Sequence, residues 1–197
     1  MHERNRRLLD AARRGDAAEV RAALDAGASV EARDEDLRSP LLIASLNSHV
    51  EAARVLVAAG ADPNAQDMRH DSAWLVTGVT GNVAMMRVLL PAGPDLTLRN
   101  RFGGISLIPA SERGHVAYVR AVLRETDIDV NHVNDLGWTA LLEAVILGDG
   151  GLDHQEIVEL LLAAGARRDL ADGDGVTPLR HAERRGFKAL AALLRAA

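Results

Sequence analysis

The sequence has no cysteine and very few aromatic residues. Without cysteine there is no disulfide framework and no thiolate nucleophile. Aromatic residues make up only 3% of the chain although hydrophobic residues make up 48%. A core of this composition is built from Ala, Leu and Val, which fits closely packed helices better than a sheet. The composition therefore favours an all-α protein.

Long hydrophobic runs and an excess of positive charge are also missing. No run of about 18 apolar residues occurs, so the sequence predicts no membrane-spanning helix. The opening MHERNRRLLDAARRGD has charge but no apolar stretch behind it and does not read as a signal peptide. With 23 basic and 28 acidic residues the formal charge is -5, which argues against nonspecific binding to nucleic acid or anionic membranes. We expect a cytoplasmic protein that contacts neither.

One stretch, from Ser39 to Asp67, shows what the chain is built from. Ser39 followed by Pro40 is a helix start, because the hydroxyl can accept from the first-turn amides and proline suits the first helical position. A second apolar segment opens near His49 and ends at Gly60, a residue suited to a left-handed helix end. One copy is therefore helix, turn, helix and loop. Helices this short cannot bury their apolar faces alone.

The same stretch returns along the whole chain. Aligning the helix-start residues Ser39, Ser72, Ile105, Thr139 and Thr177 gives intervals of 33, 33, 34 and 38 residues. A period of about 33 with a T-P-L-H-x-A pattern is typical of one kind of repeat array. The best matches to that pattern are TPLRHA from Thr177 and GADPNAQD from Gly60.

These motifs resemble the ankyrin family over nearly the whole chain. LLPAGPDL, RFGG and GWTALLEAVILGDGG are similar to segments of small stand-alone bacterial ankyrin-repeat proteins of the YahD type. The resemblance implies an all-α ankyrin-repeat solenoid of about six helix-turn-helix repeats with short β-hairpin loops. It would form a single domain over residues 1–197, with repeats at about 1–33, 34–66, 67–99, 100–133, 134–171 and 172–197.

Several positions depart from the repeat pattern. Trp74, in the third repeat, falls between the helices and is interpreted as core. The histidine of T-P-L-H is absent from every full repeat. Its absence removes a polar network that the family usually has in that layer, and we expect more of the adhesion to come from apolar packing. The fifth repeat carries five extra residues, from Asp149 to Asp153. We expect these residues to lengthen the turn between the two helices without an apolar anchor, with Asp153 as the N-cap of the second helix.

Candidate chemistry is weak. His49, His115 and His154 recur at one repeat position, and one ligand per repeat does not converge on a metal ion. GDGG lacks the Gly-Lys-Ser/Thr of a phosphate loop, and DGDG lacks the distal glutamate of a calcium loop. No nucleophile with a neighbouring base is present. We expect no enzyme activity, no cofactor and no metal.

A partner-binding surface is the remaining hypothesis. In ankyrin arrays the hairpin tips and inner helices form a concave face, and the resemblance implies a monomeric protein-protein interaction module whose partner is another protein. In the middle of that face, aromatic and apolar residues alternate with arginines, the composition of a binding hot spot. The candidate residues are Arg69, Arg99, Arg101, Phe102, Arg113, Leu136 and Trp138.

Two alternatives stay open. Phe102 and Trp138 could instead pack under neighbouring hairpins as part of the scaffold. The arginine-rich centre could also make the protein a receptor for a small molecule or an anion.

Overall fold

The computed structural model describes residues 2–196, and within them it contains twelve α-helices, one short 3-10 helix and no strand. The described chain falls into two compact units, which meet in the sequence between Arg101 and Phe102. The all-α ankyrin-repeat fold is confirmed. The hairpin loops predicted from the sequence reverse the chain through backbone hydrogen bonds and have no assigned strands in residues 2–196. A single domain over the whole chain stays a prediction.

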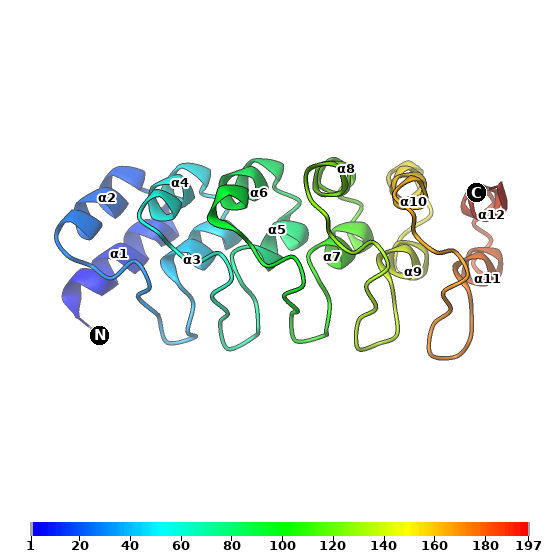
Figure 1. Ribbon diagram of the computed structural model, residues 1–197, viewed down its shortest axis with the longest axis horizontal. Helices are drawn as coiled ribbons and strands as arrows, with labels where there is room; N and C mark the ends of the chain where they lie inside the picture. The colour runs from blue at the N-terminus through cyan, green and yellow to red at the C-terminus, as the bar shows by residue number, and fades with distance from the viewer. Residues whose placement is uncertain (1, 197) are drawn as a thin grey trace. The chain divides into compact units, whose positions relative to one another are not determined.

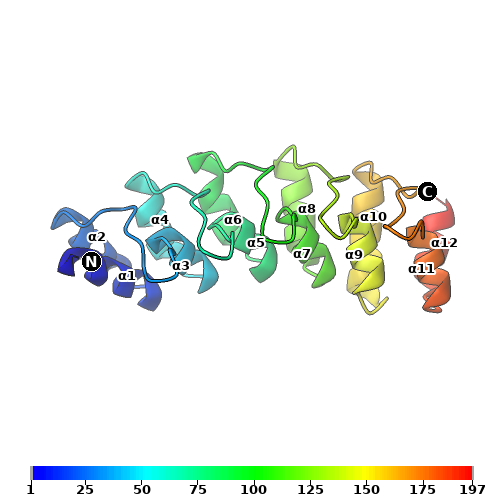
Figure 2. The same ribbon diagram turned by 90° about the horizontal axis from the view of Figure 1, so that it is seen from below.

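The first unit is a two-layer stack of helix pairs (Figure 1). Neighbouring inner helices pack together, α1 on α3 and α3 on α5, and neighbouring outer helices do the same, α2 on α4 and α4 on α6. A hairpin loop leads to each of α3 and α5 (Figure 2). The elements are α1 (Glu3–Arg14), α2 (Ala17–Asp25), α3 (Pro40–Leu46), α4 (Val50–Ala58), α5 (Leu75–Thr80), α6 (Val83–Leu89) and the 3-10 helix η1 (Leu90–Ala92).

The second unit repeats this arrangement. Its inner helix α9 packs against both α7 and α11, and its outer helix α10 packs against α8 and α12. The elements are α7 (Leu107–Glu112), α8 (Val116–Glu125), α9 (Ala140–Ile146), α10 (Leu152–Ala163), α11 (Pro178–Arg184) and α12 (Lys188–Ala196).

The inner helices α3, α9 and α11 begin where the sequence predicts, while α5 and α7 begin one or two residues later, at Leu75 and Leu107. The hydroxyls of Ser39, Thr139 and Thr177 accept from the backbone N–H three residues ahead, at 3.1, 3.2 and 3.4 Å. This bond satisfies one of the amides that a helix start leaves without a partner. The helices α5 and α7 have six residues each, whereas α3, α9 and α11 have seven.

The core positions agree with the sequence prediction. Trp74, Met85 and Met86 are fully buried at 0% exposure, so Trp74 is part of the scaffold. In α1 the buried residues are Leu8, Leu9, Ala11 and Ala12, while its arginines are exposed. A water-facing arginine surface is what a terminal repeat requires.

The inserted segment of the fifth repeat corrects the prediction. Helix α10 starts at Leu152 with Gly151 as its N-cap, so Asp153 lies inside the first turn and is not the cap. The insertion also has contacts of its own, because a Cβ on Gly150 would lie 2.7 Å from the ring of Phe187. Part of the insertion therefore lengthens α10, and the rest forms a turn packed on the next repeat.

Candidate partner-binding surface

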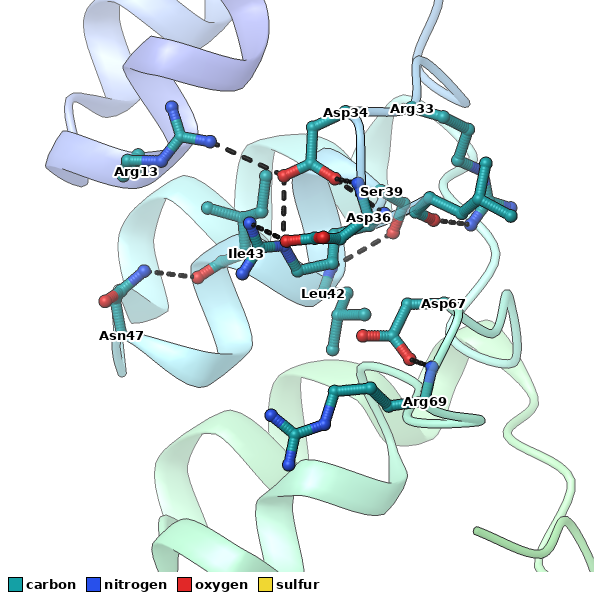
Figure 3. Close-up of polar contacts among 12 residues, drawn as sticks. Arg13, Arg33, Asp34, Asp36, Ser39, Leu42, Ile43, Asn47, Asp67 and Arg69 are labelled. Atoms are coloured by element: carbon teal, nitrogen blue, oxygen red, sulfur yellow. Dashed lines mark hydrogen bonds and ion pairs between the residues drawn. The ribbon is translucent and has the colours of Figure 1, made fainter. Parts of the chain in front are cut away.

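Four of the hairpin tips are each organised by one Asp or Asn side chain. In four tips, the Oδ1 atom of this residue accepts the backbone N–H groups two and four positions ahead, at 2.8–3.0 Å. Its own N–H donates to the carbonyl four residues ahead at 2.9–3.1 Å. Figure 3 shows two of these residues. The four are Asp34, Asp67, Asn134 and Asp172. These tips therefore have the same backbone conformation, and the other tip side chains can vary without changing it.

The residue three positions after this Asp or Asn has a left-handed backbone in both units. In the second unit it is always glycine, with φ values of 73°, 78° and 73° at Gly103, Gly137 and Gly175. In the first unit it is Leu37 (φ 62°) and His70 (φ 60°). A side chain in this region costs about 1–2 kcal/mol. Both tips of the first unit are therefore destabilised by a left-handed residue that carries a side chain.

Side chains tie down the strained tips of the first unit. Arg33 donates to the carbonyl of Leu37 at 3.0 Å and to the carbonyl of Gln66 at 3.3 Å. The Gln66 amide in turn donates to the carbonyl of His70 at 2.7 Å and to that of Arg99 at 2.8 Å. Each left-handed residue therefore has its carbonyl held by a polar side chain, and the same side chain reaches the next repeat.

Two consecutive tips of the second unit present apolar side chains at equivalent positions. Phe102 is 52% exposed and Leu136 is 55% exposed. They occupy equivalent positions on consecutive tips, which are joined by a 2.9 Å bond from the Asp135 N–H to the Phe102 carbonyl. Trp138 is half-buried, and its N–H donates to Asn134 Oδ1 at 2.9 Å. Exposed neighbouring apolar side chains are a feature of interaction sites.

The seven residues predicted as a site are divided between the two units. Arg69, Arg99 and Arg101 lie in the first unit and are exposed. Burial, together with the negative charge of Asp67, raises the pKa of the Asp71 carboxyl, and the nearby Arg69 and Arg101 only partly oppose this rise. Phe102, Leu136, Trp138 and an exposed Arg113 lie in the second unit.

A polar pair that the sequence did not predict lies beneath two tips of the second unit. In the fifth repeat, the Asn134 amide donates to Glu143 Oε1 at 3.0 Å, and in the sixth, His181 Nε2 donates to Asp172 Oδ2 at 2.6 Å. In these two repeats a polar pair therefore takes part of the place of the missing T-P-L-H histidine. The polar residue has moved one position along the helix, as the order Arg180-His181 in TPLRHA could have indicated.

Glu143 has the most perturbed environment of this group. It is only 5% exposed. Its burial, together with the nearby negative charge of Glu112, raises the pKa of its carboxyl from 4.5 to about 7, against the opposing hydrogen bond from Asn134. Close to neutral pH this side chain therefore exists in both protonation states.

The recurring histidines make backbone contacts. His49 Nε2 lies 3.1 Å from the Arg13 carbonyl, and His154 Nε2 lies 2.9 Å from the Glu112 carbonyl. Each ring thus joins the start of an outer helix to the end of the preceding inner helix. Residues 2–196 contain no group of three or more His, Asp or Glu side chains placed to hold a metal ion. Within the same range, no helix combines the length and the apolar character needed to cross a membrane.

Comparison with known proteins agrees with this architecture. The family model described as ankyrin repeats (3 copies) matches residues 4–67 and 75–172. The chain is 42% identical to the ankyrin repeat protein YahD of Escherichia coli (strain K12) over 178 residues, which cover 90% of this chain and 72% of that protein.

Two solved structures are also similar. A crystal structure of an ankyrin repeat domain from Acinetobacter baumannii AYE superposes with a TM-score of 0.92 at 46% identity, covering 96% of each chain. A second ankyrin repeat protein superposes with a TM-score of 0.93 at 36% identity, covering 99% of this chain and 98% of that one. Ankyrin repeats are a scaffold class that generally mediates protein-protein interactions. With its 33-residue period, its stacked helix pairs and these matches, the chain belongs to the ankyrin-repeat family.

Proposed function

We propose that this protein binds another protein, rather than catalysing a reaction, and that the tips of its second unit carry the contact. The observation behind the proposal is the exposure of Phe102 (52%) and Leu136 (55%) on neighbouring tips. Large apolar side chains that are exposed together gain free energy when a partner covers them, and aromatic residues are enriched among binding hot spots. The proposal keeps the expectations of a cytoplasmic monomer without a cofactor that contacts neither nucleic acid nor a membrane.

The partner we propose presents an apolar side chain between Phe102 and Leu136, next to Trp138. Arg113 is exposed on the same unit and can pair with a carboxylate of the partner, because a guanidinium offers two parallel donors. Arg69, Arg99 and Arg101, which lie in the first unit, are proposed as charged partner-binding residues of that unit.

The experiment starts with affinity capture from the native cell and mass spectrometry, followed by calorimetry on the purified pair. Trp138→Ala, Phe102→Ala and Leu136→Ala should each weaken binding, with the hot-spot member losing about 2 kcal/mol or more. The melting temperature should change little. Neutralising Arg101 and Arg113 should slow association and flatten its salt dependence.

The matched control is Met68→Ala, because Met68 is 64% exposed on a tip of the first unit. Normal affinity in this variant, beside weakened binding by Phe102→Ala, supports the proposal. If Met68→Ala loses the affinity and the three variants of the second unit do not, the contact belongs to the first unit. If Trp138→Ala loses stability in step with affinity, the tryptophan belongs to the scaffold.

A further inference from the structure

The tip of the fifth repeat is joined to its own inner helix through one buried side chain. Asn134 is 6% exposed, and its Oδ1 atom accepts the N–H groups of Leu136 and Trp138 at 3.0 and 2.9 Å. Because these two donors require the oxygen, the amide nitrogen faces the other way and donates to Glu143 Oε1 at 3.0 Å. The orientation of the Asn134 side chain, and with it both tip bonds, therefore depends on Glu143.

Glu143 is poorly solvated as an anion. It is 5% exposed. Asn134 donates to Oε1, and among the residues that the structure describes no donor reaches Oε2. A buried carboxylate is stable when several donors or a cation compensate for its lost hydration. The neutral carboxyl has no charge to desolvate, so the buried position favours the protonated form.

The charged groups around Glu143 favour the same form. The negative charge of Glu112, on α7, adds to the effect of burial, and together they raise the pKa of the Glu143 carboxyl to about 7. The other helices packed against α9 carry titratable or charged side chains that have partners of their own. These are His154 of α10, bonded to Asp149 and the Glu112 carbonyl, His181 of α11, bonded to Asp172, and Arg185, bonded to the carbonyls of Val145 and Ile146. Within the described residues, no cation pairs with Glu143.

We infer that the tip of the fifth repeat is coupled to a proton on Glu143, and that it is held while this carboxyl is neutral and loosens when the carboxyl ionises. The neutral carboxyl keeps Oε1 as an acceptor for the Asn134 amide. The ionised carboxyl, with one donor and with Glu112 nearby, gains by turning toward water. Asn134 then loses the bond that orients it, and its bonds to the Leu136 and Trp138 amides weaken.

The equivalent tip of the second repeat lacks this dependence. Asp34 Oδ1 accepts the N–H groups of Asp36 and Arg38 at 3.0 and 2.9 Å, and its Oδ2 atom accepts from Arg38 Nε at 2.9 Å. Arginine stays protonated at every pH at which proteins are folded. The position of Glu143 is taken there by Ile43, which is 3% exposed. This tip is therefore an internal control.

The test uses the full chain labelled with ¹⁵N. The side-chain amide signals of Asn134 report its bond to Glu143, and exchange of the Leu136 and Trp138 amides reports the tip. The Asn134 signals should titrate with a midpoint at a pH of about 7, set by the pKa of Glu143. Between pH 6 and pH 8, exchange corrected for its intrinsic pH dependence should rise about two- to tenfold, the range expected for one hydrogen bond of ordinary strength. The Asp36 and Arg38 amides should not respond.

Three variants assign the response to its cause. Glu143→Gln keeps an acceptor for the Asn134 amide and cannot ionise, so the response should disappear. Glu112→Gln removes the neighbouring negative charge, so the midpoint should move to lower pH. Asp135→Asn removes an exposed carboxylate from the same tip and should keep the wild-type response.

Three outcomes would overturn the coupling. The first is a wild-type chain whose Leu136 and Trp138 amides do not respond between pH 6 and pH 8. The second is stronger protection of these amides at pH 8, which would mean that the ionised carboxyl holds Asn134 more firmly. The third is a response that persists in Glu143→Gln, which would assign it to another group.

The coupling has a consequence for binding. Because Leu136 and Trp138 are also proposed to contact the partner, affinity for the partner should fall as the pH rises above about 7. That consequence rests on the proposed function, whereas the coupling itself does not. Its readouts need no partner, so either idea can fail without the other.

Discussion

The tips of the two units have the same backbone hydrogen bonds but differ in the residue at the left-handed position and in the side chains around it. In the first unit the left-handed position holds Leu37 and His70, and the side chains of Arg33 and Gln66 secure their carbonyls. In the second unit glycine takes that position, and Val133 stands where the first unit has Gln66. His132 Nε2 instead bonds the Gly103 carbonyl at 2.7 Å.

Because of this difference, tip side chains of the first unit are needed to hold the loop, whereas those of the second unit are less constrained. Polar side chains of the first unit are occupied in holding strained tips, whereas glycine relaxes the tips of the second unit. Both units expose apolar side chains at their tips, Leu37 (51%) and Met68 (64%) in the first and Phe102 (52%) and Leu136 (55%) in the second. Surface that the scaffold does not use is available to a partner. The proposed contact is placed on the second unit because Phe102 and Leu136 hold equivalent positions on consecutive tips that are joined by the Asp135–Phe102 backbone bond.

The largest loss of stability should come from substitutions in the cores, and the loss should be similar in the two units. Leu41 and Leu141 occupy the same repeat position and are 0% and 1% exposed. Truncating either leucine to alanine should cost about 2–5 kcal/mol in the free energy of unfolding, measured in urea. Arg4→Ala, on the exposed surface of α1, should change it by less than about 0.5 kcal/mol. A small loss at one leucine and a large loss at the other would show that the cores differ as well as the tips.

A pH-dependent effect should follow in the second unit. A carboxyl whose pKa rises from 4.5 to about 7 on folding destabilises the fold as pH rises through that window, because the unfolded chain ionises first. Glu143→Gln keeps an acceptor for the Asn134 amide and removes the charge. It should therefore raise stability by about 1–3 kcal/mol at pH 8 and by little below pH 4.5.

Urea titrations at pH 4.5 and pH 8 measure this difference, and the exposed Glu159→Gln is the control. A gain that is equal at both pH values would mean that burial of the charge is not its cause.

Two substitutions at the left-handed position of the tips should change the free energy of unfolding by smaller amounts and in opposite directions. Leu37→Gly relieves the left-handed side chain but makes the unfolded chain more flexible, so a net gain of about 0.5 kcal/mol is expected. Gly137→Ala introduces a side chain with φ 78° and a Cβ only 3.3 Å from the Gly173 nitrogen, and should cost about 1 kcal/mol. Thermal unfolding of both variants gives the two signs. If both variants lose stability, Leu37 contributes packing that outweighs its strain.

Local chemistry made much of the fold predictable. The Ser39-Pro40 start, the left-handed Gly60 (φ 86°) and the buried Trp74 follow from the residues alone or from their place in the period. The Asn134–Glu143 pair was not predictable in this way, because nine residues separate its members and only the tip geometry brings them together. The two acceptors of the His154 ring come from α7 and from the insertion, so no local pattern reveals them. The partner-binding residues stay a prediction.

The reversed polarity of the two pairs beneath the tips limits how repeats can be exchanged. In the fifth repeat the tip donates and the helix accepts, whereas in the sixth the helix donates and the tip accepts. Grafting the tip of the sixth repeat onto the fifth would place an aspartate at position 134 against Glu143, so that two carboxylates would meet at a site with room for one proton. A designer who shuffles these repeats must therefore move each tip together with its own inner helix.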